Sequence, residues 1–266
     1  MTLRVPPLLQ QNAYLGPVPG AELRPPGGGI RDTHLALIRY EGGTRRAYIK
    51  HFPDHEPFGL FNEALACTIL TGLGVPCAAG AVIYAPVMGA GPVRPAFASL
   101  ESPLKFEGTA KQIYKVHAAG VAELTRRLHA CGAFASIVAA DQLLANSDRN
   151  LGNIAFVGPH TLEIFDHDAI LGGPSLPTER LYEPLGWSRS KLIEDLNPIH
   201  TLPKRVKTSI MAAAEVLLER FYQIQPDFRE AIQVKANGRS CASADAIWWR
   251  SLDLVEWFHQ RLGLLI

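Results

Sequence analysis

Cysteine is scarce in this chain of 266 residues, and its four cysteines lie far apart. No two of them form a C-x-x-C pair, so neither a zinc site nor a disulfide framework is indicated. The chain also lacks an apolar run near the roughly 18 to 20 residues that cross a bilayer. Its first ten residues carry one arginine and too short an apolar core for a signal peptide. These absences predict a globular protein of the cytoplasm with no membrane partner.

A strong net charge of either sign is missing as well. The 26 basic and 25 acidic residues leave a formal charge of +1, and no overall basic field points to a nucleic-acid partner. Lysine is the rarer cation, at eight of the 26 basic residues, and the first hundred residues contain only Lys50. Either this lysine is a chance survivor in an arginine-rich chain, or that position needs an ammonium group.

The first hundred residues have the pattern of a strand-rich unit with one helix. The opening stretch to Gly29 is rich in proline and glycine, which predicts turns and short extended pieces. Gly42-Gly43 separates two apolar-alternating runs, which predicts a hairpin. Apolar residues at helical spacing predict a helix over 58–74 that stops at a glycine. The strands are expected at 33–40, 45–52, 77–87 and 93–100.

Beyond Pro103 the pattern becomes mainly helical, with one or two helices over 116–146 and further helices over 204–224 and 244–263. Their apolar spacing places Trp248, Trp249 and Trp257 in the core of this region. Two short strands, 153–157 and 162–166, interrupt the helices around a turn at Gly158-Pro159. We therefore expect an α+β chain with a small lobe over 1–102 and a helical lobe over 103–266, with the joint near 99–103.

The segment from Asp141 to Asp168 carries the residues of chemical interest. Asp148 is followed by Asn153, and Asp166 closes a short apolar strand thirteen positions later. Phosphoryl transfer requires a protein to orient a hydroxyl group and to neutralise phosphate charge through a metal ion. Mg²⁺ prefers hard oxygen ligands, so one carboxylate and one amide oxygen can suffice from the protein. Asn153 and Asp166 are the candidate ligands, and Asp148 is the candidate base or orienting group for the acceptor hydroxyl.

The remaining phosphate-binding groups are expected upstream. Lys50 ends a predicted strand and Glu63 lies in the next helix, which is the arrangement that holds the phosphates of ATP through a lysine paired with a glutamate. The run Gly27-Gly28-Gly29 precedes these strands, where backbone N–H groups can approach phosphate without obstruction by a Cβ atom. This order of residues predicts an ATP site that uses Mg²⁺.

The pattern D-x4-N-x-D-R-N-x2-N resembles the catalytic loop of the HipA-like kinases. It comprises Asp141, Asn146, Asp148, Arg149, Asn150 and Asn153. The resemblance covers roughly 33–173, and the loop is also similar to the D-R-H-x-x-N of phosphatidylinositol kinases. It implies an α+β, bilobal protein-kinase-like fold whose two lobes form one catalytic unit. It further implies transfer of the γ-phosphoryl group of ATP, with a protein serine or threonine as the acceptor. Asp148 would then be the catalytic aspartate, and Asn153 and Asp166 would bind Mg²⁺. Lys50 would contact the phosphates of ATP, and Glu63 would hold Lys50 in place.

The chain departs from the family pattern at two places. Asn150 stands where the family usually has histidine, and Phe165-Asp166-His167-Asp168 replaces the D-F-G of ordinary protein kinases. Asp168 is either an additional metal ligand or a capping and hydrogen-bonding residue, and His167 is interpreted as a packing or orienting residue. A lipid or small-molecule kinase and a nucleotide-binding pseudokinase remain alternatives, and the resemblance leaves room for a regulatory partner protein.

Overall fold

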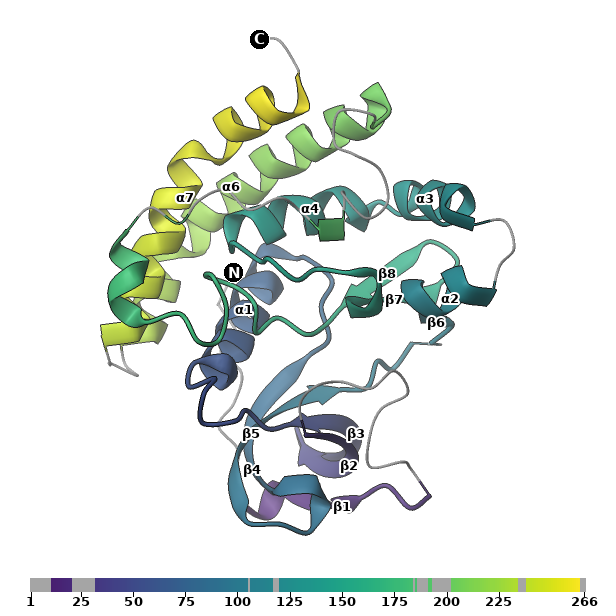
Figure 1. Ribbon diagram of the computed structural model, residues 1–266, viewed down its shortest axis with the longest axis vertical. Coiled ribbons are helices and arrows are strands. Elements are labelled where there is room, and N and C mark those ends of the chain that lie inside the picture. The colour runs from purple at the N-terminus through teal and green to yellow at the C-terminus, as the bar shows by residue number, and fades with distance from the viewer. Residues whose placement is uncertain are drawn as a thin grey trace.

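A computed structural model describes residues 11–20, 32–104, 106–116, 120–183, 185, 191–192, 202–233 and 238–263. An antiparallel sheet from the N-terminal part of the chain lies at one end of the molecule, and long helices from the C-terminal part lie at the other (Figure 1). Helix α1 lies between them. No helix in the described ranges is both long enough and apolar enough to cross a membrane.

The N-terminal sheet has five strands in the order β1-β2-β3-β5-β4. Alternating burial along the strands directs Ala36 and Ile38 of one strand and Ala47 and Ile49 of its neighbour into a common apolar core. A short 3₁₀ turn, η1, covers 11–13 ahead of the first strand. The strands are β1 (Tyr14–Pro17), β2 (Thr33–Tyr40), β3 (Gly43–Lys50), β4 (Gly80–Pro86) and β5 (Val93–Leu100).

The hairpin between β2 and β3 is confirmed, with its turn one position earlier than expected. Tyr40 pairs with Gly43, so the two turn residues are Glu41 and Gly42. Both have positive φ, 46° and 78°. Two left-handed residues in succession match the right-handed twist of the flanking strands. The glycine pair in the sequence therefore marked the hairpin, and Gly43 itself opens β3.

Helix α1 (Gly59–Leu73) follows the predicted boundaries closely. It ends at Gly74, which adopts the left-handed conformation with φ of 70° and whose N–H caps two carbonyls of the last turn. Its buried residues Leu65, Ile69 and Leu70 belong to the same apolar core as the C-terminal helices. Helix α1 is thus packed on the helical part of the molecule while it also reaches the sheet.

The helical part surrounds α4, whose residues are buried on nearly every side. A second, three-stranded sheet in the order β6-β7-β8 lies beside it. The expected region 116–146 is divided: α2 ends at Val116, and α3 and α4 follow on either side of a break at Cys131-Gly132. The elements are β6 (Gly108–Thr109), α2 (Ala110–Val116), α3 (Gly120–Ala130), α4 (Ala133–Leu143), η3 (Leu151–Asn153), β7 (Ile154–Gly158), β8 (Thr161–Ile164), η4 (Thr178–Tyr182), α6 (Lys204–Gln233) and α7 (Gly238–Leu262).

One core prediction is wrong. Trp249 is 67% exposed, whereas Trp248 and Trp257 pack against the core. Consecutive residues on a helix point about 100° apart, and the buried stripe of α7 runs through Leu254 and Phe258 instead. Trp248 therefore lies at the edge of the buried stripe, and Trp249 lies outside it.

Candidate active site

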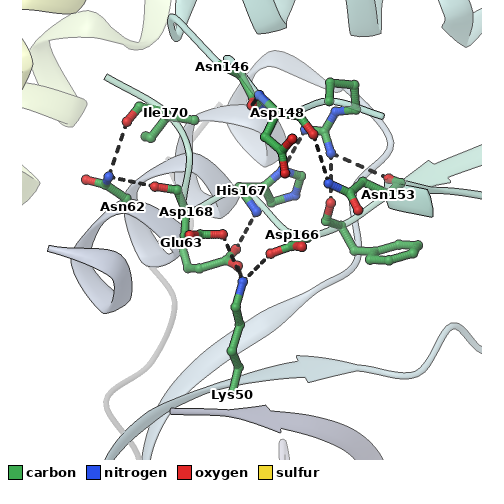
Figure 2. Close-up of polar contacts among 12 residues, drawn as sticks. Lys50, Asn62, Glu63, Asn146, Asp148, Asn153, Asp166, His167, Asp168 and Ile170 are labelled. Carbon is green, nitrogen blue, oxygen red and sulfur yellow. Dashed lines mark hydrogen bonds and ion pairs between the residues drawn. The ribbon is translucent and has the colours of Figure 1, made fainter. Parts of the chain in front are cut away.

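Lys50 is the centre of the strongest polar cluster in the described part of the chain. Its neighbour Ile49 faces the sheet core, so the lysine side chain leaves β3 on the opposite face, toward α1. The Nζ atom donates to Oε1 of Glu63 at 2.8 Å and to Oδ1 of Asp168 at 2.9 Å, and it also forms an ion pair with Asp166 (Figure 2). Only 13% of the lysine side chain is exposed. One ammonium group therefore faces three carboxyl groups in a nearly closed space.

Glu63 joins this cluster to the segment after β8. Its Oε1 atom accepts from Lys50, and its Oε2 atom accepts from the backbone N–H of His167 at 2.8 Å. The side chain is 2% exposed, and burial raises the pKa of its carboxyl group, with Lys50 acting in the opposite direction. A buried carboxylate with both oxygens engaged holds the lysine in one position.

Asp166 follows β8 by two residues and adopts the left-handed conformation, with φ of 63°. This conformation is uncommon for residues other than glycine, and aspartate tolerates it better than most. It leaves Asp166 at 35% side-chain exposure, while Asp168 is at 5%. Burial raises the pKa of Asp168 to about 7, against the opposing effect of Lys50. The two carboxyl groups thus differ in access to solvent although both contact Lys50.

The loop after α4 is held from within by Arg149, a fully buried side chain. Its guanidinium group pairs with Asp141, with Nε to Oδ2 at 3.1 Å, and both side chains are 1% exposed. It also donates to the carbonyl of Phe165 at 2.7 Å and to Nδ1 of His167 at 2.8 Å. Burial and the neighbouring Arg149 keep the pKa of His167 well below its ordinary value. Arg149 therefore fastens the loop to the segment that carries Asp166, and His167 is buried between Arg149 and Glu63.

Asp148 lies at the exposed end of the same loop. Its side chain is 50% exposed and pairs with Lys191, with Nζ to Oδ1 at 2.7 Å. Leu192, the next residue, is fully buried in the helical core, which anchors Lys191 beside the aspartate. The Asn153 amide donates to the carbonyl of Asp148 at 3.0 Å, and the Asn150 side chain accepts from the N–H of Gly152 at 2.8 Å. Asn150 thus caps η3.

The donor set suits a magnesium ion. One oxygen from each of Glu63, Asp166 and Asp168 lies within 4.8 Å of the others. The backbone carbonyl of Asn153 accepts from Phe165 N–H at 3.2 Å, so the asparagine lies next to the residue that precedes Asp166 (Figure 2). These groups offer only hard oxygen atoms, which Mg²⁺ prefers. The carboxylates of Asp166 and Asp168 therefore fit a magnesium ion, and Asn153 on the adjoining loop stays a predicted ligand.

Lys50, Glu63 and Asp166 come together, and Asp148 and Asn153 share the adjoining loop. The predicted glycine-rich turn, Gly27 to Gly29, lies outside the described residues, in the connection from β1 to β2.

Two contributors were missed. Asn62, fully buried, donates to the carbonyls of Asp168 at 2.8 Å and Ile170 at 3.2 Å. Its place next to Glu63 was the only signal for it. Lys191 pairs with Asp148 across 43 positions of the chain, and no local pattern marks it.

Comparisons with known proteins show the fold. No protein-family model matches the chain, and no curated protein matches it in sequence. Among solved structures, the proinflammatory kinase CtkA of Helicobacter pylori is similar, with a TM-score of 0.62 and 15% sequence identity. The match covers 97% of this chain and 100% of that one. The chain therefore has an α+β, bilobal kinase-like fold, as the sequence predicted.

Proposed function

We propose that this protein is an ATP-dependent kinase of the HipA-like kind, which transfers the γ-phosphoryl group of ATP to a serine or threonine hydroxyl of a protein. The observation that carries the proposal is the cluster of Lys50 with Glu63 and Asp166. The half-exposed carboxylate of Asp148 lies on the adjoining loop. Phosphate binding and acceptor activation need these two kinds of group in adjacent places. The similar structure of a kinase supports the proposal at the level of the fold.

Lys50 is the group proposed to bind phosphate oxygens of ATP. Glu63 orients the ammonium, because its second oxygen is fixed by the His167 N–H. An arginine would serve poorly here, since its broad planar group has a different reach from a compact ammonium. The nucleotide would lie between the lobes 1–102 and 103–266. The role of Gly27 to Gly29 in phosphate binding stays a prediction from the sequence.

Asp166 and Asn153 are the residues proposed to hold Mg²⁺, with Asp168 as a further carboxylate. When bound, the metal ion neutralises the negative charge of the transferring phosphoryl group. The chain supplies the orientation of these ligands: Arg149 fixes the backbone at Phe165, and Asn62 fixes it at Asp168 and Ile170. The Asp166 side chain, which pairs with Lys50, is still 35% exposed, so a metal ion could reach its carboxylate from solvent.

Asp148 is proposed to accept or orient the proton of the incoming hydroxyl group. Its carboxylate is half exposed, so an acceptor can reach it from solvent. Lys191 lies 2.7 Å away and places a cation where negative charge develops during transfer. The loop itself contains no lysine, so Lys191 provides this charge from another part of the chain.

The test of these roles is the variant Asp148→Ala, assayed with radiolabelled ATP and Mg²⁺ against wild type. We expect phosphoryl transfer to fall by about 100-fold or more, because general acid–base groups contribute factors of about 100 to 10,000. Binding of ATP, measured by titration calorimetry, should be retained because Lys50 and Glu63 are intact.

The matched control is Asp253→Ala, which removes an exposed aspartate on α7 and should leave transfer unchanged. Wild-type activity in Asp148→Ala would mean that the assignment of Asp148 is wrong. Label that enters phosphoinositide vesicles and no protein would show that the acceptor is a lipid and not a protein.

A further inference from the structure

Two thiols, Cys67 and Cys77, meet beside helix α1 and have no part in the proposed transfer. Both are unoxidised, Cys67 is buried and Cys77 is partly exposed. Thr71, one helical turn after Cys67, places its Oγ1 atom 3.7 Å from the sulfur of Cys77. The sulfur of Cys67 lies 3.7 Å from the carbonyl oxygen of Ala78, the residue that follows Cys77. These contacts bracket the two sulfur atoms between α1 and the residues that precede β4.

The two thiols are chemically unequal. Contact with the Cys67 thiol lowers the pKa of Cys77, against the opposing effect of burial. The same contact, together with burial, raises the pKa of Cys67 well above its ordinary value. The thiolate is the nucleophile in thiol oxidation, and access to solvent exposes it to oxidants. Cys77 therefore has the character of the attacking thiol, and Cys67 that of the resolving thiol.

The pair also connects the two elements that hold the lysine cluster. Cys67 lies one helical turn beyond Glu63 on the same helix. Cys77 lies against the end of β8, because Ile164 donates to the carbonyl of Pro76 at 3.1 Å and accepts from Ala78 N–H at 2.9 Å. Ile164 precedes Asp166 by two residues. A covalent link between the two sulfurs would thus tie the helix of Glu63 to the strand that leads to Asp166.

We propose that Cys67 and Cys77 form a redox modification site at which hydrogen peroxide closes a disulfide that lowers phosphoryl transfer. The Cys77 thiolate attacks peroxide, which breaks the O–O bond, gives a sulfenic acid and releases hydroxide. The Cys67 thiol then attacks that sulfur and displaces its hydroxyl group, so that the S–S bond forms and water leaves. The two thiols are oxidised by two electrons, and one peroxide is reduced.

The effect on activity follows from geometry and rests on the proposed function. A disulfide requires sulfur atoms about 2.05 Å apart, far closer than two thiols in contact. We expect closure of the bond to draw helix α1 and the strand segment toward each other, and Glu63 and Asp166 to move with them. Displacement by about 1 Å at a reacting centre can cost up to about 100-fold in rate. We expect transfer to fall by about tenfold or more on oxidation and to recover when dithiothreitol reduces the bond.

The experiment treats the full chain with hydrogen peroxide and compares it with the untreated protein. Intact mass should fall by about 2 Da, because two thiol hydrogens are lost. Peptide mapping without reductant should place the bond between Cys67 and Cys77. In Cys67→Ser the bond cannot form, and Cys77 should instead be trapped as a sulfenic acid by dimedone.

The matched control is Cys241→Ser, which removes an exposed cysteine and should leave the oxidation unchanged. An unchanged mass, a bond that involves Cys131 or Cys241, or an oxidised protein as active as the reduced one would overturn the proposal. The mass and peptide map do not depend on kinase activity. A reduced protein that transfers no phosphate would therefore count against the proposed function alone, while the mapped bond would still establish the modification site.

Discussion

At the scale of single residues, Lys191 is the side chain whose role the structure changes most. Its ion pair with Asp148 places an ammonium at the point where the acceptor hydroxyl would arrive. For Lys191→Ala we expect kcat to fall by about 100-fold, the lower end of the range of about 100-fold to 1,000-fold for loss of one preorganised donor at a developing charge. The KM for ATP should change little, since Lys50 and Glu63 are intact. Steady-state kinetics with varied ATP separates the two constants.

The matched control for Lys191 is Lys204→Ala, which removes an exposed lysine at the start of α6 and should have no effect. Lys191→Arg should keep part of the activity, because the charge remains while its shape changes. A rise in kcat in Lys191→Ala would contradict the role, since it would show that the lysine blocks the acceptor position.

The site residues differ in how well the sequence could predict them. Lys50 could be predicted because it is the only lysine in the first hundred residues and precedes a helix with a glutamate. Asp148 and Asn153 share one short loop, so their spacing is visible directly. Lys191 could not be predicted, because only the folded chain, with Leu192 anchored in the core, brings it to Asp148.

At the scale of elements, the loop between α4 and η3 depends on the buried pair of Arg149 and Asp141. Replacement Arg149→Met would leave the Asp141 carboxylate buried without its cation, in a place where burial already raises its pKa. Removal of one partner of a buried pair typically costs about 3–5 kcal/mol. We expect a loss of that order in the free energy of unfolding, measured by urea denaturation.

The double variant Asp141→Leu with Arg149→Met is the control for this pair. It removes both charges, so stability should recover in part relative to Arg149→Met. A single variant within about 1 kcal/mol of wild type would contradict the role of the pair, because so small a change is typical of exposed ion pairs.

The elements themselves were predictable where their signal is local. Gly74 marked the end of α1 because a left-handed cap favours glycine, and Gly42 marked the hairpin for the same reason. Strand β6 was missed because it has two residues and forms only by pairing with β7. Trp249 was misplaced because apolar spacing alone does not show which side of a tryptophan doublet another helix covers.

At the scale of the whole molecule, buried histidines link stability to pH. His34 lies in β2 and His51 directly follows β3, with their ring centroids 6.3 Å apart, and burial lowers the pKa of both below the ordinary value of 6.5. Below pH 6.5 the two histidines bind protons in the unfolded chain, whereas they stay neutral in the folded protein until the pH reaches their lowered pKa values. The contribution of these histidines to the free energy of unfolding is therefore complete above about pH 6.5 and is lost as the pH falls toward their lowered pKa values.

Thermal melting between about pH 7.5 and about pH 5.5 measures this linkage. The double variant His34→Gln with His51→Gln should lose less stability than wild type over that range. Asp168, with its pKa raised to about 7, makes the folded protein more stable as the pH falls, opposite to the histidines. Comparison with the variant isolates the effect of the histidines, because Asp168 is present in both proteins. Equal changes in melting temperature in the two proteins would contradict the linkage.

The central claim is that the whole molecule transfers the γ-phosphoryl group of ATP to a protein hydroxyl, and one measurement tests it most directly. Purified wild-type protein is incubated with γ-labelled ATP and candidate protein acceptors, with and without Mg²⁺, and the products are identified by mass spectrometry. We expect label on serine or threonine that requires Mg²⁺ and disappears in Lys50→Met. Transfer by wild type no greater than by Lys50→Met, in the presence of Mg²⁺, would contradict it.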